Sequence, residues 1–287
     1  MEAGVGRAHG AVSVLNAIAT GIGGAVGIDV PVEARVRLSG DAGRVVIESR
    51  TPWGRVTPPR ELSTALLELA REMGHSGGLE VEVYSRVPPA SGLKSSSALV
   101  NSITLGLADA LGVEMSLEEA ARLGVTVSRR AGLTLTDAYD DSLATLLPGV
   151  FITDNWGLRI LRRFTFDETL YAVAAVPPTG RPIQAVEPGV FESLGRHYSR
   201  AVDLALEGRW MEAMAVNAVL TLVATGLDEW SIGLVARALE HEATLLAGVS
   251  GKGPSVYALT TDPRGVADAW GEAGVEVIVA RLLGGGR

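Results

Sequence analysis

The pattern of hydrophobic and polar residues predicts a chain that mixes strands with amphipathic helices. Apolar and polar residues alternate over 30–38 and over 79–85, a period that is typical of strands with one buried face. Residues 44–49 form another predicted strand, which we expect to pair with 30–38 as a hairpin across a glycine-containing turn. Leucines at helical spacing predict a helix over 61–73 that ends at Gly74.

Later parts of the chain continue this mixture. A loop rich in glycine and serine precedes a predicted helix over 95–111, and a capping box from Ser116 to Glu119 begins a helix that ends near Arg130. The remaining expected elements are, in chain order, strands 149–153, 159–166 and 171–176, helices 189–207, 209–225 and 231–242, strand 255–260, helix 263–273 and strand 275–281.

This alternation of elements predicts an α+β fold. The chain has 287 residues, of which 47% are hydrophobic, so it is long enough for one large domain or two small ones with a sizeable core. The best candidate for a boundary between two parts of the chain lies near residues 154–170. We therefore expect two lobes, 1–155 and 156–287, with a cleft between them.

One uncharged stretch, residues 11–28, has the length of a membrane span or a signal peptide. Its four glycines, together with Ser13, Asn16 and Thr20, would make a poor helix in lipid, and the stretch has no clean cleavage site. We expect instead a buried strand or helix joined through a glycine-rich loop, in a cytoplasmic protein.

The composition excludes several kinds of protein. A net charge of −8 argues against a general nucleic-acid binder, and the absence of cysteine excludes disulfides, thiolate metal sites and cysteine nucleophiles. The four histidines lack the spacing of a zinc site. Only two of the 25 basic residues are lysines, Lys94 and Lys252. Both lie in stretches rich in glycine and serine, where a compact ammonium next to exposed amides suits a phosphate.

The first of these stretches has the features of a phosphate-binding loop. Its glycine lets the backbone approach a ligand, and its serines precede a predicted helix, whose free amides and dipole favour an anion. A serine hydroxyl here can also coordinate Mg²⁺ bound to phosphates, whereas the structural alternative is a serine-rich helix cap. The stretch consists of Pro89, Ala90, Ser91, Gly92, Leu93, Lys94, Ser95, Ser96, Ser97 and Ala98.

Three further stretches are candidates, each with a structural alternative. Residues 248–255, around the second lysine, are by themselves typical of a turn before a strand. Asp137, Asp140 and Asp141 form either a solvated acidic loop or a general base and Mg²⁺ partner, because like charges this close repel unless solvated, protonated or bound to metal. The glycine-rich segment 16–24 is either a packed turn or part of a ligand pocket.

Two common nucleotide-binding motifs are absent. A Walker A loop fails because Leu246 stands at its first glycine and Gly253 follows the lysine. A dinucleotide-binding GxGxxG fails because Val26 stands at its last glycine, so a dinucleotide-dependent oxidoreductase is the weakest alternative.

The order and separation of the candidate stretches resemble the GHMP small-molecule kinases, such as galactokinase, homoserine kinase and mevalonate kinase. PASGLKSSSA near residue 90 looks like their second signature, and GVSGKGPS near residue 250 looks like their third. Within this superfamily, LNAIATGIGGAVGID over 15–29, GLKSSSA, and LTLTDAYDD over 133–141 resemble the archaeal shikimate kinases. The resemblance spans nearly the whole chain.

This resemblance implies a two-lobe GHMP kinase fold and transfer of the γ-phosphoryl group of ATP, with Mg²⁺, to the 3-hydroxyl of shikimate. Residues 89–98 would then bind ATP, with Lys94 neutralising phosphate charge and Ser96 as a Mg²⁺ ligand. Asp141, supported by Asp140, would orient or deprotonate the acceptor hydroxyl. The residues expected to bind the acceptor are Asn16, Thr20, Gly21, Ser250, Gly251, Lys252 and Gly253.

Three residues depart from the family pattern, one of which is Lys252, because a small residue is more usual at this position of the third loop. Asp137 stands where we expect glycine, and Arg130 stands eleven residues before Asp141, where several GHMP kinases carry a Mg²⁺-binding glutamate. Mg²⁺ is therefore held differently here, for example by Ser96 and an aspartate, or its site is looser. An arginine should face the carboxylate of shikimate, and Arg7, Arg130 and Arg181 are the candidates.

Other functions stay open at this point. A kinase of homoserine, mevalonate or a sugar would carry the same signature loops, and a non-catalytic metabolite sensor could share the fold. We expect a small-molecule substrate and no nucleic-acid or membrane partner, and both a monomer and a homodimer remain open.

Overall fold

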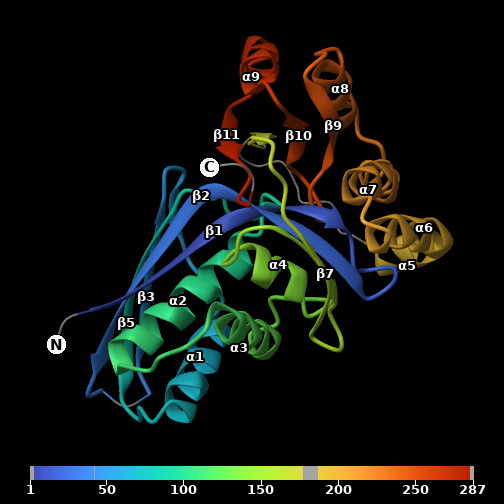
Figure 1. Ribbon diagram of the computed structural model, residues 1–287. Helices are drawn as coiled ribbons and strands as arrows, with labels where there is room; N and C mark the ends of the chain where they lie inside the picture. Colours follow the sequence, from blue (N-terminus) through green and yellow to red (C-terminus); the bar gives the residue numbers. More distant parts are fainter. Residues whose placement is uncertain (1–2, 42, 177–186, 285–287) are drawn as a thin grey trace.

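The computed structural model describes residues 3–41, 43–176 and 187–284, which form two sheets with their helices (Figure 1). The strands of the first sheet are β1 (Gly4–Leu15), β2 (Ile22–Ser39), β3 (Val45–Thr51), β4 (Gly54–Val56), β5 (Gly78–Ser85), β6 (Val150–Asp154) and β7 (Arg159–Phe164). Their order is β4-β3-β5-β2-β6-β7, and β1 pairs in addition with β2. The helices on one face of this sheet are α1 (Arg60–Glu72), α2 (Ser95–Leu111), α3 (Leu117–Arg130) and α4 (Tyr139–Ala144).

A second, smaller sheet carries the rest of the chain. Its strands, in the order β11-β8-β10-β9, are β8 (Tyr171–Ala175), β9 (Thr244–Val249), β10 (Val256–Thr260) and β11 (Val277–Arg281). The accompanying helices are α5 (Pro188–Ser193), α6 (Gly195–Leu206), α7 (Trp210–Ala224), α8 (Glu229–Leu239) and α9 (Pro263–Glu272). The predicted α+β class is confirmed.

The predicted hairpin between 30–38 and 44–49 is wrong. Strand β5 lies between β2 and β3, antiparallel to β2 and parallel to β3. After β3 the chain passes through β4 and helix α1 before it returns as β5. The alternation of apolar residues predicts which face of a strand is buried, but it carries no information about which strand lies beside it.

The uncharged stretch 11–28 consists of the end of β1, the turn over 16–21 and the start of β2, and its strand residues are mostly buried. In the described part of the chain no helix has the length and apolar character needed to cross a bilayer. Elements that we did not predict include the short strand β4, strand β9, in which the chain re-enters the second sheet, and helix α4, which holds the acidic residues.

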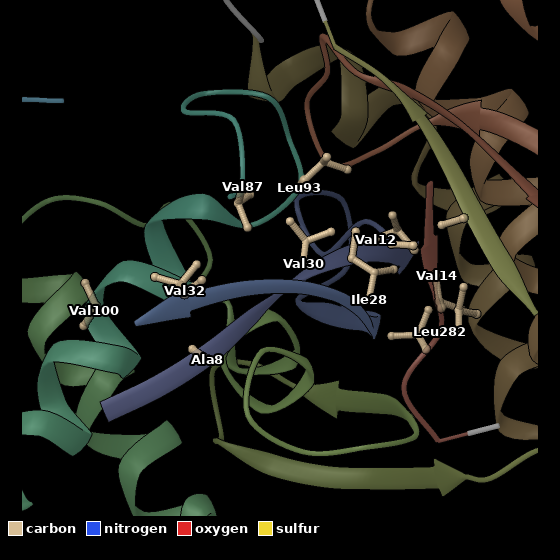
Figure 2. Packing of buried hydrophobic residues seen from close by; sticks show 14 of the residues in the cluster. Ala8, Val12, Val14, Ile28, Val30, Val32, Val87, Leu93, Val100 and Leu282 are labelled. Carbon is tan, nitrogen blue, oxygen red and sulfur yellow. The ribbon is translucent and has the colours of Figure 1, made fainter. Parts of the chain in front are cut away.

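The main hydrophobic core extends across both sheets and includes residues near both ends of the chain. Figure 2 shows Leu282 close to Val14 and Ile28 of the first two strands. Leu282 forms a bridge with Ile28, and the backbone N–H of Leu283 donates to Gly27 O at 2.8 Å. The end of the chain thereby ties the second sheet to the first.

The chain changes from the first sheet to the second between β7 and β8. Strand β7 still pairs with β6, so the first sheet continues past the predicted lobe limit after residue 155 and ends at Phe164. The connection between the sheets therefore lies inside the region 154–170, which the sequence pattern indicates as the candidate boundary.

Truncating Leu282 tests this connection. Its side chain is 1% exposed, and Leu282→Ala should lower the free energy of unfolding by about 2–5 kcal/mol, because a cavity forms where the chain end meets the first sheet. Val279→Ala is the matched control, since that side chain is 47% exposed on the same segment and should change stability by about 0.5 kcal/mol or less. Urea unfolding of both variants measures the difference. Equal effects would show that the chain end does not stabilise the core.

Candidate active site

The N-terminus of α2 opens onto a cavity. Lys94 directly precedes the helix in a left-handed conformation, with φ 64° and ψ 31°, and its side chain makes no capping hydrogen bond. Lysine carries no acceptor, so no side chain at this position caps the first N–H groups of the helix. Ser95, Ser96 and Ser97 line the cavity at this end. Free amides, hydroxyls and the positive end of the helix dipole together suit a phosphate group.

The cavity has a volume of about 280 Å³ and is built from five segments of the chain. These are the end of β1, the loop before α2, helix α3, the segment around α4, and the loop between β9 and β10. The predicted site residues that line it are Asn16, Ala90, Gly92, Lys94, Ser95, Ser96, Ser97, Asp140, Asp141, Gly251, Lys252 and Gly253. The structure thus brings all four candidate stretches together.

Other predicted residues lie around the cavity rather than in its wall. Leu93 and Ala98 are buried beneath the loop, and Pro89 is exposed. Thr20 and Gly21 belong to the turn between β1 and β2. The remaining two predicted residues, Ser91 and Ser250, are buried between the loops.

Lys94 and Asp141 form an ion pair inside the cavity. Lys94 Nζ lies 2.9 Å from Asp141 Oδ1, and the two side chains are only 10% and 16% exposed. Asp140, the neighbouring residue, is 4% exposed and also lines the cavity. Burial and the adjacent Asp141 charge raise the pKa of Asp140 to about 7, against the lowering influence of Lys94. One ammonium group therefore balances two nearly buried carboxylates, and one of these carboxylates titrates near neutral pH.

The absence of a side chain at Gly23 leaves room for the Asp140 carboxylate. A Cβ atom at Gly23 of β2 would lie 2.5 Å from Asp140 Oδ2, so a larger residue there would displace the carboxylate. On its other side, Asn155 Nδ2 donates to Asp140 Oδ1 at 2.9 Å. From the sequence alone, Asn155 is an ordinary turn residue with no role in the site.

Ser250 joins the two loops that carry the lysines. Its hydroxyl donates to Gly92 O at 2.9 Å and accepts from the backbone N–H of Ser13 at 3.3 Å. The backbone N–H of Gly251 donates to Ser13 Oγ at 3.0 Å, and Asn16 Nδ2 donates to Gly251 O at 3.0 Å. Hydrogen bonds thus hold the third loop against both the phosphate loop and the end of β1.

The described arginine candidates do not reach the cavity. Arg7 pairs with Glu33 at 3.1 Å, and Arg130 pairs with Glu72 of α1 at 2.7 Å, so both guanidinium groups are held by carboxylates outside the cavity wall. Arg181 lies outside the described residues. Within the described chain, the basic side chains that line the cavity are those of the two lysines.

The segment before α4 explains one departure from the family pattern. Asp137 has a φ of 60°, in the left-handed region that favours glycine. Its carboxylate accepts two hydrogen bonds from Arg129, at 2.9 and 2.7 Å. Arg129 therefore fixes an aspartate in the cavity wall at a position where glycine would be conformationally easier.

Mg²⁺ fits this site only together with phosphate. Among the described residues, no three His, Asp or Glu side chains gather closely enough to hold a metal ion on their own. Mg²⁺ bound to nucleotide takes most of its ligands from phosphates and water, and needs only one or two oxygen ligands from the protein. The exposed hydroxyl of Ser96, in the cavity wall, meets this requirement.

The cavity-lining residues that the sequence analysis did not assign to the site include a run directly before α4, which consists of Leu133, Thr134, Leu135 and Thr136. Thr134 Oγ1 is buried and has no hydrogen-bond partner in the described structure. These four residues directly precede the acidic residues, and this position in the sequence is the observation from which they could have been predicted.

Comparison with known proteins gives consistent results. Residues 61–149 match the family described as GHMP kinases N terminal domain. The chain is 41% identical to the shikimate kinase of Aeropyrum pernix, with 96% of this chain and 97% of that one covered. It is 36% identical to the shikimate kinase of Thermococcus kodakarensis, covering 93% of this chain and 96% of the relative.

Solved structures show the same fold at low sequence identity. Homoserine kinase from Cytophaga hutchinsonii superimposes with a TM-score of 0.77 at 19% identity, covering 100% of this chain and 96% of that one. Mevalonate kinase from L. major superimposes with a TM-score of 0.75 at 17% identity, covering 100% and 97%. The predicted two-lobe fold is confirmed.

Replacing Asp140 with asparagine should stabilise the protein in a pH-dependent way. The folded pKa of Asp140 is raised, so between about pH 4 and pH 7 the folded protein holds a proton that the unfolded chain has lost. The contribution of this carboxyl to stability therefore falls as pH rises through that window. Asp140→Asn removes this loss and should add up to about 4 kcal/mol at pH 8 and much less near pH 4. Urea unfolding at both pH values measures the gain, and an equal gain at both would refute a raised pKa.

Proposed function

The chain belongs to the archaeal shikimate kinase family of the GHMP kinases, and we propose that it transfers the γ-phosphoryl group of ATP to the 3-hydroxyl of shikimate. The observation that carries this proposal is its identity of 41% to a shikimate kinase along nearly the whole of both chains. The cavity supports it, because a phosphate-binding helix terminus and a carboxylate pair face the same space. The products are ADP and shikimate 3-phosphate.

The nucleotide phosphates bind at the N-terminus of α2. The uncapped amides of its first turn and the Lys94 ammonium face the cavity, where they stabilise the charge of the transferring group. The Ser96 hydroxyl is the protein ligand for Mg²⁺, which supplies charge neutralisation on the phosphates when bound. Phosphoryl transfer depends mainly on such positioning, and we assign this role to residues 89–98.

The carboxylate pair prepares the acceptor. The acceptor oxygen forms a bond to the γ-phosphorus while the bond from that phosphorus to the ADP oxygen breaks, and the hydroxyl proton passes to a carboxylate. Asp141, fixed by Lys94, orients the hydroxyl, and Asp140 with its pKa of about 7 is matched to take up the proton near neutral pH. The two residues act as one unit because their charges are coupled.

Lys252 is the candidate partner for the carboxylate of shikimate. It is exposed in the cavity wall and makes no ion pair within the described chain, whereas Lys94 is paired with Asp141. The loop around it is held in place through Ser250 and Gly251. This lysine thus takes the role expected of an arginine. Asn16 and the neighbouring turn, with Thr20 and Gly21, complete the acceptor side.

The need for ATP supports a cytoplasmic protein. We propose no nucleic-acid or membrane partner, and a monomer or homodimer is sufficient because all five segments of the cavity come from one chain.

A substrate panel tests the function. Related structures with this fold include homoserine and mevalonate kinases, so the loops alone do not distinguish the acceptor. ADP release with Mg-ATP is measured against shikimate, homoserine, mevalonate and galactose, and we expect turnover on shikimate alone. Turnover on another acceptor would reject the substrate, and ATP binding without turnover on any of them would favour a sensor.

Lys252→Gln tests the carboxylate site. Loss of a charge-assisted hydrogen bond should raise KM for shikimate about 10- to 100-fold and leave KM for ATP within about twofold. Lys252→Arg, which keeps the charge, is the matched control and should retain a KM for shikimate near that of the wild type. A rise in KM for ATP instead would assign Lys252 to the phosphates.

A further inference from the structure

Asn155 lies directly after β6 and is completely buried beside the acidic pair. Its Oδ1 accepts a hydrogen bond from the backbone N–H of Asp140 at 3.2 Å and another from Thr153 Oγ1 at 2.6 Å. Its Nδ2 donates to Asp140 Oδ1 at 2.9 Å. One amide side chain thus binds both the backbone and the carboxylate of the same residue.

These contacts fix the orientation of the Asn155 amide. A backbone N–H can only donate, so the oxygen of the amide must face Asp140 N, and the NH₂ group then faces the carboxylate. With the amide in this orientation, the Thr153 hydroxyl donates to the same oxygen. Thr153 and Asn155 are two residues apart, and Thr153 pairs in the sheet with Gly23, the residue that leaves room for Asp140 Oδ2. The carboxylate is therefore held between β2 and the end of β6.

We propose that Asn155, held in place by Thr153, is a positioning residue that fixes the Asp140 carboxylate and sets the pH range in which the acidic pair accepts the acceptor proton. This inference rests on the proposed function, in which Asp140 takes up that proton. Asn155 acts through Asp140 and does not line the cavity.

Among the groups around Asp140, Asn155 is the neutral side chain that donates a hydrogen bond to the carboxylate. The charged groups that act on it are Asp141, its neighbour on α4, and Lys94, which precedes α2. Strand β2 contributes the neutral Gly23, and β1 and α3 contribute neutral residues such as Ser13 and Ser128 to the same cavity. An N–H donor stabilises the ionised carboxylate, so the hydrogen bond from Asn155 lowers the pKa of Asp140 against the effect of burial.

The experiment measures kcat/KM for shikimate between pH 5.5 and 9.5 in the wild type and in Asn155→Leu, which keeps the number and branching of the side-chain heavy atoms but has no hydrogen-bonding group. The acid limb of the profile should move to higher pH by about one unit. At a given pH on the acid limb, kcat/KM should therefore be about tenfold lower than in the wild type, and it should recover toward the wild-type value at high pH. KM for ATP should stay within about twofold.

Asn101→Leu is the matched control. Asn101 is also a completely buried asparagine, and its Nδ2 donates to Ser142 O and Thr145 Oγ1 at α4 and its C-cap, without touching Asp140. A purely structural effect on α4 should lower the rate equally at every pH and leave the acid limb in place. A folded Asn155→Leu with an unmoved acid limb, or a shift of equal size in Asn101→Leu, would overturn the inference.

Two further measurements keep the test decisive. If Asn155→Leu does not fold, Thr153→Val removes the hydroxyl that orients the amide while keeping the side-chain shape, and should move the limb in the same direction by a smaller amount. If the wild type shows no turnover on shikimate, the proposed function fails by itself. The inference is then tested by the pH dependence of unfolding, whose inflection near pH 7 should move up in Asn155→Leu and stay in place in Asn101→Leu.

Discussion

Two adjacent carboxylates share one ammonium group in this protein, and the rest of the site is arranged around that constraint. Asp140 and Asp141 are both nearly buried, and Lys94 pairs with the second. Burying a second negative charge is costly unless it is protonated or stabilised by hydrogen bonds. The absence of a side chain at Gly23 and the amide of Asn155 give Asp140 a fixed place, and its raised pKa relieves part of the cost.

Lys94 contacts the acidic pair and also belongs to the loop expected to bind phosphate. Lys94 adopts a left-handed conformation directly before α2, and its ammonium pairs with Asp141 in the cavity that Ser95, Ser96 and Ser97 of the first helical turn also line. The third loop approaches closely, because Ser250 bonds to Gly92 and a Cβ at Gly251 would contact the lysine at 3.4 Å. Segments far apart in the sequence are therefore positioned by backbone contacts, and substrates would bind a site that is largely formed in advance.

The sequence predicted the local parts of this arrangement and missed those that depend on distant contacts. Helix α2, its preceding loop and the acidic residues follow from local composition and periodicity, and they lie where the resemblance to GHMP kinases places them. The β2–β3 hairpin failed because alternation does not specify the neighbouring strand. Asn155 looked like a turn residue because its burial comes from the packing of β6 against α4. Arg7 and Arg130 were candidates by charge alone, and their pairing with glutamates is a property of the folded surface.

Site-resolved ¹³C NMR titration of the aspartate carboxyl groups tests most directly whether the acidic pair holds a proton near neutral pH. Asp140→Asn is used to assign the signal. We expect the Asp140 carboxyl to titrate near pH 7, well above the ordinary range of an aspartate. If every aspartate carboxyl were fully ionised by pH 5, the acidic pair would hold no proton near neutral pH. Asp140 would then lack the raised pKa that suits it to take up the acceptor proton, and its role in acceptor activation would be wrong.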